Sequence, residues 1–120
     1  MRSGRIERVY ESRPLDGLDG FAIARSGAIY VAMLLTNQLA VIGADGREAE
    51  RFPPTPLSGD NGGPVPFDAP SSVRFLGTRL LVADQAFVTG DAAHQAILDV
   101  QAGERGLREY VPRPRKRRAP

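Results

Sequence analysis

Short apolar runs separated by glycine- and proline-rich turns make up most of the chain. No window of roughly 11 to 18 residues keeps its apolar residues at helical spacing. The runs are rich in valine, isoleucine, leucine, phenylalanine and tyrosine, which is typical of β-strands. The pattern predicts eight strands, at residues 21–24, 28–34, 38–42, 48–52, 72–75, 79–83, 96–100 and 107–110. The sequences Arg25-Ser26-Gly27, Ala44-Asp45-Gly46 and Leu76-Gly77-Thr78 predict tight turns, because glycine and aspartate tolerate the positive φ that hairpins require.

The first two strands of each half form an internal repeat. The sequence DGFAIARSGAIYVA, from Asp19, aligns with SSVRFLGTRLLVA, from Ser71, so that Phe21 matches Val73 and Val31 matches Val82. Two further predicted strands follow each copy. Four antiparallel strands in a repeat of roughly 40 to 50 residues are typical of a β-propeller blade, whose first strand lines the central channel. The predicted fold is therefore all-β, a propeller fragment of about two blades; an unrelated eight-stranded sandwich is the alternative.

The predicted blades divide the chain into five parts. Residues 1–12 are a lead-in or the last strand of a preceding blade, residues 13–53 a blade, and residues 54–70 a proline- and glycine-rich linker. Residues 71–112 form a closing blade with an insertion at 84–95, in which Asp91 is expected to cap a single helical turn. The SGDNGG run in the linker is expected to be a flexible loop. Residues 113–120 are expected to form a disordered basic tail.

Charge and composition exclude several classes of protein. The formal net charge is +2, but five basic residues lie in the last eight, and the remaining 11 basic and 14 acidic side chains give a body of about −3. The basic character therefore belongs to the tail, and no nucleic-acid partner is expected. The chain contains no apolar run of about 18 residues that could span a membrane. Its first residues contain no signal peptide, so we expect a soluble protein, cytoplasmic by default. The absence of cysteine excludes disulfides and thiolate metal sites.

The sequence resembles a known propeller family in two places. The blade from Leu18 is similar to the fifth blade of the gluconolactonase, regucalcin (senescence marker protein) and luciferin-regenerating-enzyme-like family, whose pattern there is P-D-G-[ILMF]-x-x-D-x-x-G-x-[IL]-[YW]-V-A. The matching residues are Asp19, Gly20, Phe21, Gly27, Ile29, Tyr30, Val31 and Ala32, followed by Asp45 and Gly46 in the next hairpin. Two further segments look like the family's closing blade: PSSVRFLGTRLLVADQAFVTGD and ILDVQAGERGLREYVP. The sequence departs from the pattern at Leu18, where proline is usual, and in a shortened hairpin at Thr78.

The resemblance implies the C-terminal part of a six-bladed, metal-dependent hydrolase of sugar lactones. A divalent cation, calcium or zinc, would polarise the lactone carbonyl and activate a water molecule. Asp19 matches the family's aspartate that binds the metal and assists proton transfer, so it is the predicted catalytic and metal-binding residue. Four further blades, with the family's other metal ligands, would precede Arg13. Because hard cations take six or more oxygen ligands, no metal is expected to bind this chain alone, and the chain is expected to be inactive in isolation.

Other candidate residues have structural alternatives. Asp16 is either a second carboxylate at the channel mouth or a turn residue. Asn37 and Gln38 are either pocket-lining groups or part of a hairpin. Ser71 and Ser72 hold the repeat positions of Asp19 and Gly20 and are expected to face the channel. His94, the single histidine, is expected to be a polar residue of a surface insertion.

Two functional alternatives to an enzyme remain. One is a non-catalytic propeller that acts as a binding module or scaffold, and the other is a ring closed by several copies. Two blades alone leave apolar faces and strand edges exposed, so we expect self-association and marginal stability.

Overall fold

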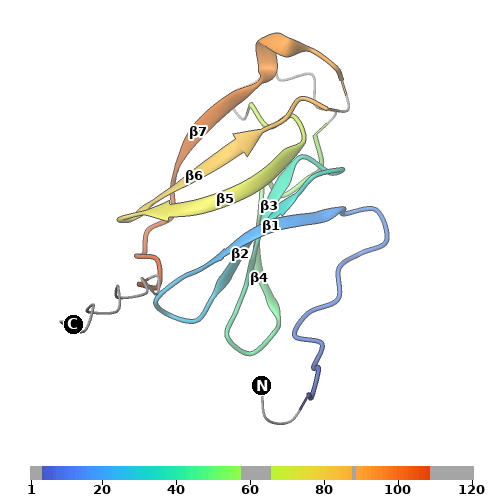
Figure 1. The fold of residues 1–120 in the computed structure, drawn as a ribbon. Coiled ribbons are helices and arrows are strands. Elements are labelled where there is room, and N and C mark those ends of the chain that lie inside the picture. Colours follow the sequence, from blue (N-terminus) through green and yellow to red (C-terminus); the bar gives the residue numbers. More distant parts are fainter. Residues whose placement is uncertain (1–3, 58–65, 88, 109–120) are drawn as a thin grey trace, which may run out of the picture.

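Two antiparallel sheets make up the protein in the computed structural model, which describes residues 4–57, 66–87 and 89–108 (Figure 1). The first sheet has the order β1-β2-β3-β4, with β1 at Leu18–Ile23, β2 at Ile29–Met33, β3 at Gln38–Ile42 and β4 at Glu48–Phe52. The second has the order β5-β6-β7, with β5 at Pro70–Leu76, β6 at Arg79–Asp84 and β7 at Ala96–Gln101. The all-β prediction is confirmed. Among the described residues, no helix is long and apolar enough to cross a membrane.

The single helical turn predicted in the insertion is present. It is the 3₁₀ turn η1 (Ala92–His94), which precedes β7. Asp91 is its N-cap, and the Asp91 carboxylate accepts the Ala93 N–H at 2.9 Å. This contact satisfies one of the amide donors that a helix start leaves without an intrahelical partner.

The eighth predicted strand, 107–110, is not formed over the residues that the structure describes, which end at 108. After β7 the chain turns at Gly103, whose φ is +76°, and crosses to the first sheet. There Gly106 forms an isolated bridge with Ala24, and the segment fills part of the free edge of β1 instead of pairing with β7. The second sheet therefore has three described strands, where four were predicted. The predicted SGDNGG loop and the basic tail lie outside the described residues.

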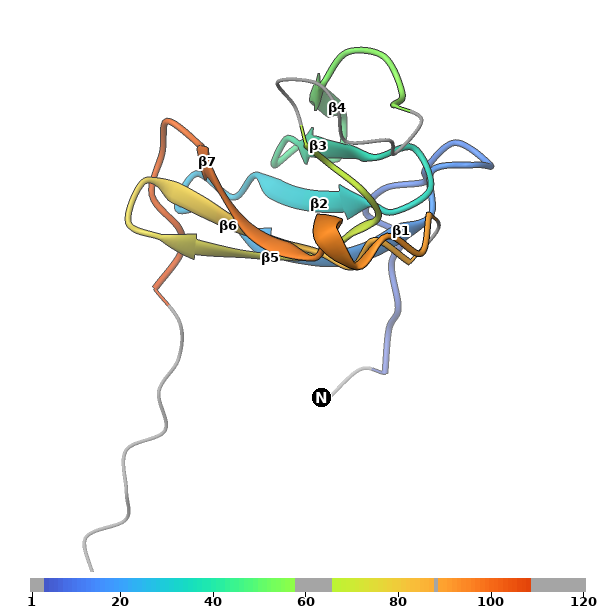
Figure 2. The ribbon, with the colours of Figure 1, turned by 90° about the horizontal axis from the view of Figure 1, so that it is seen from above.

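The internal repeat is a structural repeat. Phe21 pairs with Val31 in the first sheet, and the aligned residues Val73 and Val82 pair in the second. The sheets stack through a shared apolar core, with β1 beside β5 (Figures 1 and 2). This core contains Ala24, Ala28, Tyr30, Ala32, Leu39, Phe67, Val73, Leu80 and Val82. Because side chains alternate along a strand, Val31 and Met33 of β2 lie on the opposite face, in a second cluster with Ala40 and Ile42.

The N-terminal segment covers this second cluster. Tyr10 packs against it, and the hairpin at Gly46 approaches the same segment so closely that a Cβ there would lie 2.6 Å from the Val9 carbonyl oxygen. Residues 4–12 form no strand.

The distance between the two sheets changes across the fold. At the start of β1, a Cβ on Gly20 would lie 2.7 Å from the Ser71 carbonyl oxygen, so the inner strands touch there. Between the outer strands a cavity of about 270 Å³ remains, lined by Phe52 of β4 and Val100 of β7 among others. The sheets thus converge along their first strands, and the N-terminal ends of β1 and β5 meet at one end of the molecule.

Candidate functional site

Asp19 lies in a β-bulge at the start of β1. Leu18 pairs with Met33 and Phe21 with Val31, so Asp19 and Gly20 both lie opposite the one residue between those partners. A bulge re-aims the side chains of its strand, and bulges are frequent beside functional sites. Asp19 is exposed, and its carboxylate has no polar partner among the described residues. The predicted site residue is therefore accessible at the end where the sheets converge.

The second sheet carries a bulge at the equivalent place. Pro70 pairs with Asp84 and Ser72 with Ala83, which leaves Ser71 as the extra residue. Ser71 is buried and its hydroxyl donates to the Ala83 carbonyl oxygen at 3.3 Å, whereas Ser72 is exposed. The predicted equivalence of Ser71 and Ser72 with Asp19 and Gly20 is thus matched in register, and Gly20 lies directly against Ser71.

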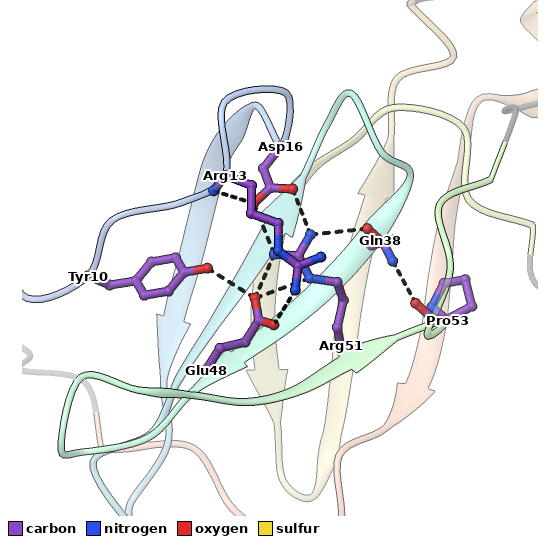
Figure 3. Close-up of polar contacts among 7 residues, drawn as sticks. All are labelled: Tyr10, Arg13, Asp16, Gln38, Glu48, Arg51 and Pro53. Atoms are coloured by element: carbon purple, nitrogen blue, oxygen red, sulfur yellow. Dashed lines mark hydrogen bonds and ion pairs between the residues drawn. The ribbon is translucent and has the colours of Figure 1, made fainter.

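Asp16, the second candidate carboxylate, belongs to a buried ion pair (Figure 3). Arg51 of β4 donates to both its oxygens, at 2.6 Å from Nη1 and 2.9 Å from Nη2. The exposed fractions of the two side chains are 6% for Arg51 and 2% for Asp16. The same guanidinium donates to Glu48, which also accepts from the Tyr10 hydroxyl. Asp16 therefore fastens the N-terminal segment to β4 and is not free to bind a ligand.

The pKa values in this network follow from the pairing. Hydrogen bonds from Arg51 lower the pKa of Asp16 and of Glu48, against the opposing effect of burial. Burial, together with its hydrogen bond to Glu48, raises the pKa of Tyr10. The bidentate pairing of Arg51 raises its pKa further above neutrality. The network therefore stays ionised around neutral pH, which suits a structural role.

Asn37 and Gln38 also have structural partners. Asn37 donates to the Leu57 carbonyl oxygen at 2.9 Å and accepts the Ala69 N–H at 2.7 Å, so it ties the first sheet to the start of the second. Gln38 donates to the Pro53 carbonyl oxygen and accepts from Arg51, as Figure 3 shows. Both side chains are buried, which favours the structural alternative over pocket lining.

A polar cluster that the sequence did not predict lies at the same end of the second sheet. Asp68 is fully buried, and its Oδ2 accepts from the Thr89 hydroxyl at 2.6 Å and lies 2.8 Å from His94 Nδ1. His94 Nε2 lies 3.4 Å from Asp91 Oδ2. His94 is a polar residue of the surface insertion, as expected, and its imidazole in addition holds η1 against a buried carboxylate.

Asp84 adds a second buried carboxylate to this cluster. It ends β6, and its Oδ2 accepts the Asp68 N–H at 3.0 Å. Burial raises the pKa of Asp84 to about 6, and the nearby negative charge of Asp68 acts in the same direction. Oδ1 of Asp68 and Oδ1 of Asp84 are buried without a hydrogen-bond partner among the described residues. The Asp84 carboxyl can therefore take up a proton near pH 6.

Backbone conformation around the cluster is strained. Asn37, Ala69 and Ala86 all have positive φ, of 56°, 52° and 51°. This region is uncommon for residues other than glycine, and for alanine no side-chain contact offsets the cost. Hydrogen bonds hold the three in place: Asn37 to Ala69, and the Ala86 N–H to the Asp68 carbonyl oxygen at 2.9 Å. Strain of this kind concentrates at functional sites.

Sequence reasoning missed the cluster because its members lie far apart along the chain and outside the motifs that carry the family resemblance. Asp68 fell in the expected linker, and Asp84 and His94 fell in the expected insertion. The one usable signal was the helix-capping pattern at Asp91, which placed an ordered turn directly before His94.

Two comparisons with known proteins identify no relative of this chain. No protein-family model matches the chain, and no curated protein matches it.

Proposed function

We propose that this chain forms two blades of a β-propeller related to the gluconolactonase-like lactone hydrolases, and that Asp19 is one carboxylate of its catalytic mouth. The observation that carries the proposal is the repeated bulge: the same inner-strand position is bulged in both sheets, and the two bulges touch at Gly20 and Ser71. Adjacent blades around a channel would have their inner strands in contact and their outer strands further apart. The two sheets have this arrangement, with a cavity between their outer strands.

The described residues include no group of three or more histidine, cysteine, aspartate or glutamate residues that could hold a metal ion. A hard cation needs six or more oxygen ligands, and Asp19 offers one carboxylate. Lactone hydrolysis is therefore proposed for an assembly in which other segments complete the ring, and no catalytic step is assigned to this chain alone.

The proposal is tested on the natural protein, tagged at its own locus and purified from its own cells. Hydrolysis of δ-gluconolactone is followed with a pH indicator after chelation and after readdition of calcium or zinc. Asp19→Asn is expected to abolish metal-dependent hydrolysis. Asp45→Asn removes the same charge from the hairpin at the opposite end of the first sheet, where Asp45 accepts the Arg47 N–H, and should leave activity unchanged.

Two results would contradict this assignment. Hydrolysis that survives Asp19→Asn would exclude that residue from the reaction. A natural protein with no metal-dependent lactonase activity would leave a non-catalytic binding module, the second candidate.

A further inference from the structure

A groove of about 880 Å³ runs between β1 and β5 at the end opposite Asp19. The two strands touch at Gly20 and Ser71, and the groove opens beyond that contact towards their C-terminal ends. Phe21 and Ile23 of β1 are 61% and 40% exposed, although both are large and apolar. Val73 and Phe75 of β5 complete the apolar lining. The groove thus offers accessible apolar surface in a concave setting.

The polar lining of this groove is basic. Among the residues that the structure describes, four arginines and no acidic residue contribute to it; the four are Arg25, Arg74, Arg105 and Arg108. Among the described residues, the side chains of Arg25, Arg105 and Arg108 make no ion pair. Outside the groove, Arg8 and Arg79 pair with Glu11 and Asp99, whereas the exposed Arg47 makes no ion pair among the described residues. Three guanidinium groups that make no ion pair in the described part of the chain, those of Arg25, Arg105 and Arg108, therefore lie beside the apolar lining.

Backbone hydrogen bonds hold in place the rim of the groove, the edge that carries Arg25 and Arg105. The Arg25 N–H donates to the Arg105 carbonyl oxygen, and the Leu107 N–H donates to the Ile23 carbonyl oxygen, both at 2.8 Å. Between them Gly106 lies against Phe75, so closely that a Cβ at Gly106 would overlap the Phe75 side chain. A side chain at 106 would therefore displace this segment, and Arg105 and Arg108 flank a position that backbone hydrogen bonds fix.

We propose that this groove binds an amphipathic organic anion, a carboxylate, sulfonate or phosphate group on an apolar body. The guanidinium fork matches two oxygens of such a group, and the exposed aromatic and aliphatic side chains suit its apolar part. The volume falls within the usual range of small-molecule sites. The proposal does not rest on the proposed hydrolase function, because it uses neither Asp19 nor a metal.

The test uses the purified full chain and the fluorescent probe 1-anilinonaphthalene-8-sulfonate, an aromatic anion. Saturable binding is expected, and three competitors separate the contributions. Decanoate, with charge and apolar body, should displace the probe. Decanol, with the body alone, and tripolyphosphate, with charge alone, should displace it at least tenfold less effectively, a difference of about 1.4 kcal/mol.

Two variants, together with one control variant, then test where the probe binds. Replacing Arg25 and Arg105 together by glutamine should weaken probe binding roughly tenfold or more, whereas Arg47→Gln, an exposed guanidinium on another hairpin, should not. Gly106→Ala displaces the rim without changing charge and should weaken binding similarly, with thermal unfolding recorded to show that the fold persists. Unsaturable binding, equal displacement by decanol and decanoate, or full affinity in the double variant would overturn the proposal.

Discussion

Asp84 is expected to make the protein less stable as the pH rises. Its side chain is buried, one oxygen accepts the Asp68 N–H, and the other has no partner among the described residues. Burial raises its pKa to about 6 from an ordinary value of 3.8. Between these two values the folded chain binds more protons at this position than the unfolded chain. The free energy of unfolding should therefore rise as the pH falls through 6 and level off near 4.

The size of the effect follows from the pKa difference. A difference of about 2 between the folded and unfolded chains corresponds to about 3 kcal/mol, since each pKa unit is worth about 1.4 kcal/mol. Asp84→Asn removes the charge and keeps an oxygen that can accept the Asp68 N–H. At pH 8 the variant should be more stable than the wild type by up to about 3 kcal/mol, and the difference should shrink towards pH 4 to 5.

Urea unfolding followed by circular dichroism, at several pH values from 5 to 8, measures this difference. Comparing the two chains at each pH cancels the titration of distant groups that both contain. Asp99→Asn is the control, because Asp99 lies on the neighbouring strand and is half exposed in its pair with Arg79. A variant that is less stable at pH 8, or a difference that does not change with pH, would refute the reasoning.

Three further predictions concern stability and assembly. Asp16→Ala leaves the Arg51 guanidinium buried without its bidentate partner and should lower the free energy of unfolding by about 3 to 5 kcal/mol; a loss below 1 kcal/mol in urea unfolding would argue against a buried pair. Gly20→Ala places a Cβ against the Ser71 carbonyl oxygen and should lower the thermal midpoint by several degrees, because the sheets must move apart at their closest point. The exposed side chains of Ile6 and Leu15 add to a surface that should drive self-association, so sedimentation equilibrium should give a mass above the monomer; a monomer over the whole concentration range would contradict this.

The strands were predictable because their signals are local. Seven of the predicted strands overlap β1 to β7, and the repeat alignment pairs the same residues in both sheets. The strand predicted at 107–110 from an equally local pattern is not formed at 107–108, and its last two residues lie outside the described part of the chain. Contacts distant in sequence determine where this segment lies. The free edge of β1 offers it hydrogen-bond partners, and the turn at Gly103 directs the chain towards that edge.

The polar clusters were not predictable because nothing local pairs their members. Asp16 and Arg51 are 35 residues apart, and Asp68 and His94 are 26 apart. An aspartate before glycine, such as Asp16, has the same local signature whether it stays solvated in a turn or pairs in the interior. Only the three-dimensional arrangement decides which carboxylates are buried, and hence which acquire a shifted pKa.

The two proposed sites lie at opposite ends of the inner strands and differ in the sign of their charge. Asp19, Asp68 and Asp84 lie at the N-terminal ends of β1 and β5, whereas Arg25 and Arg105 lie at the other end. Such a gradient attracts cations to one end and anions to the other, and it weakens as salt screens it. The proposals can therefore fail separately. Asp19→Asn should leave binding of the anionic probe unchanged, and replacing the groove arginines should leave metal-dependent hydrolysis unchanged. If either substitution altered the other readout, the two ends would act as one site, and assigning them different ligands would be wrong.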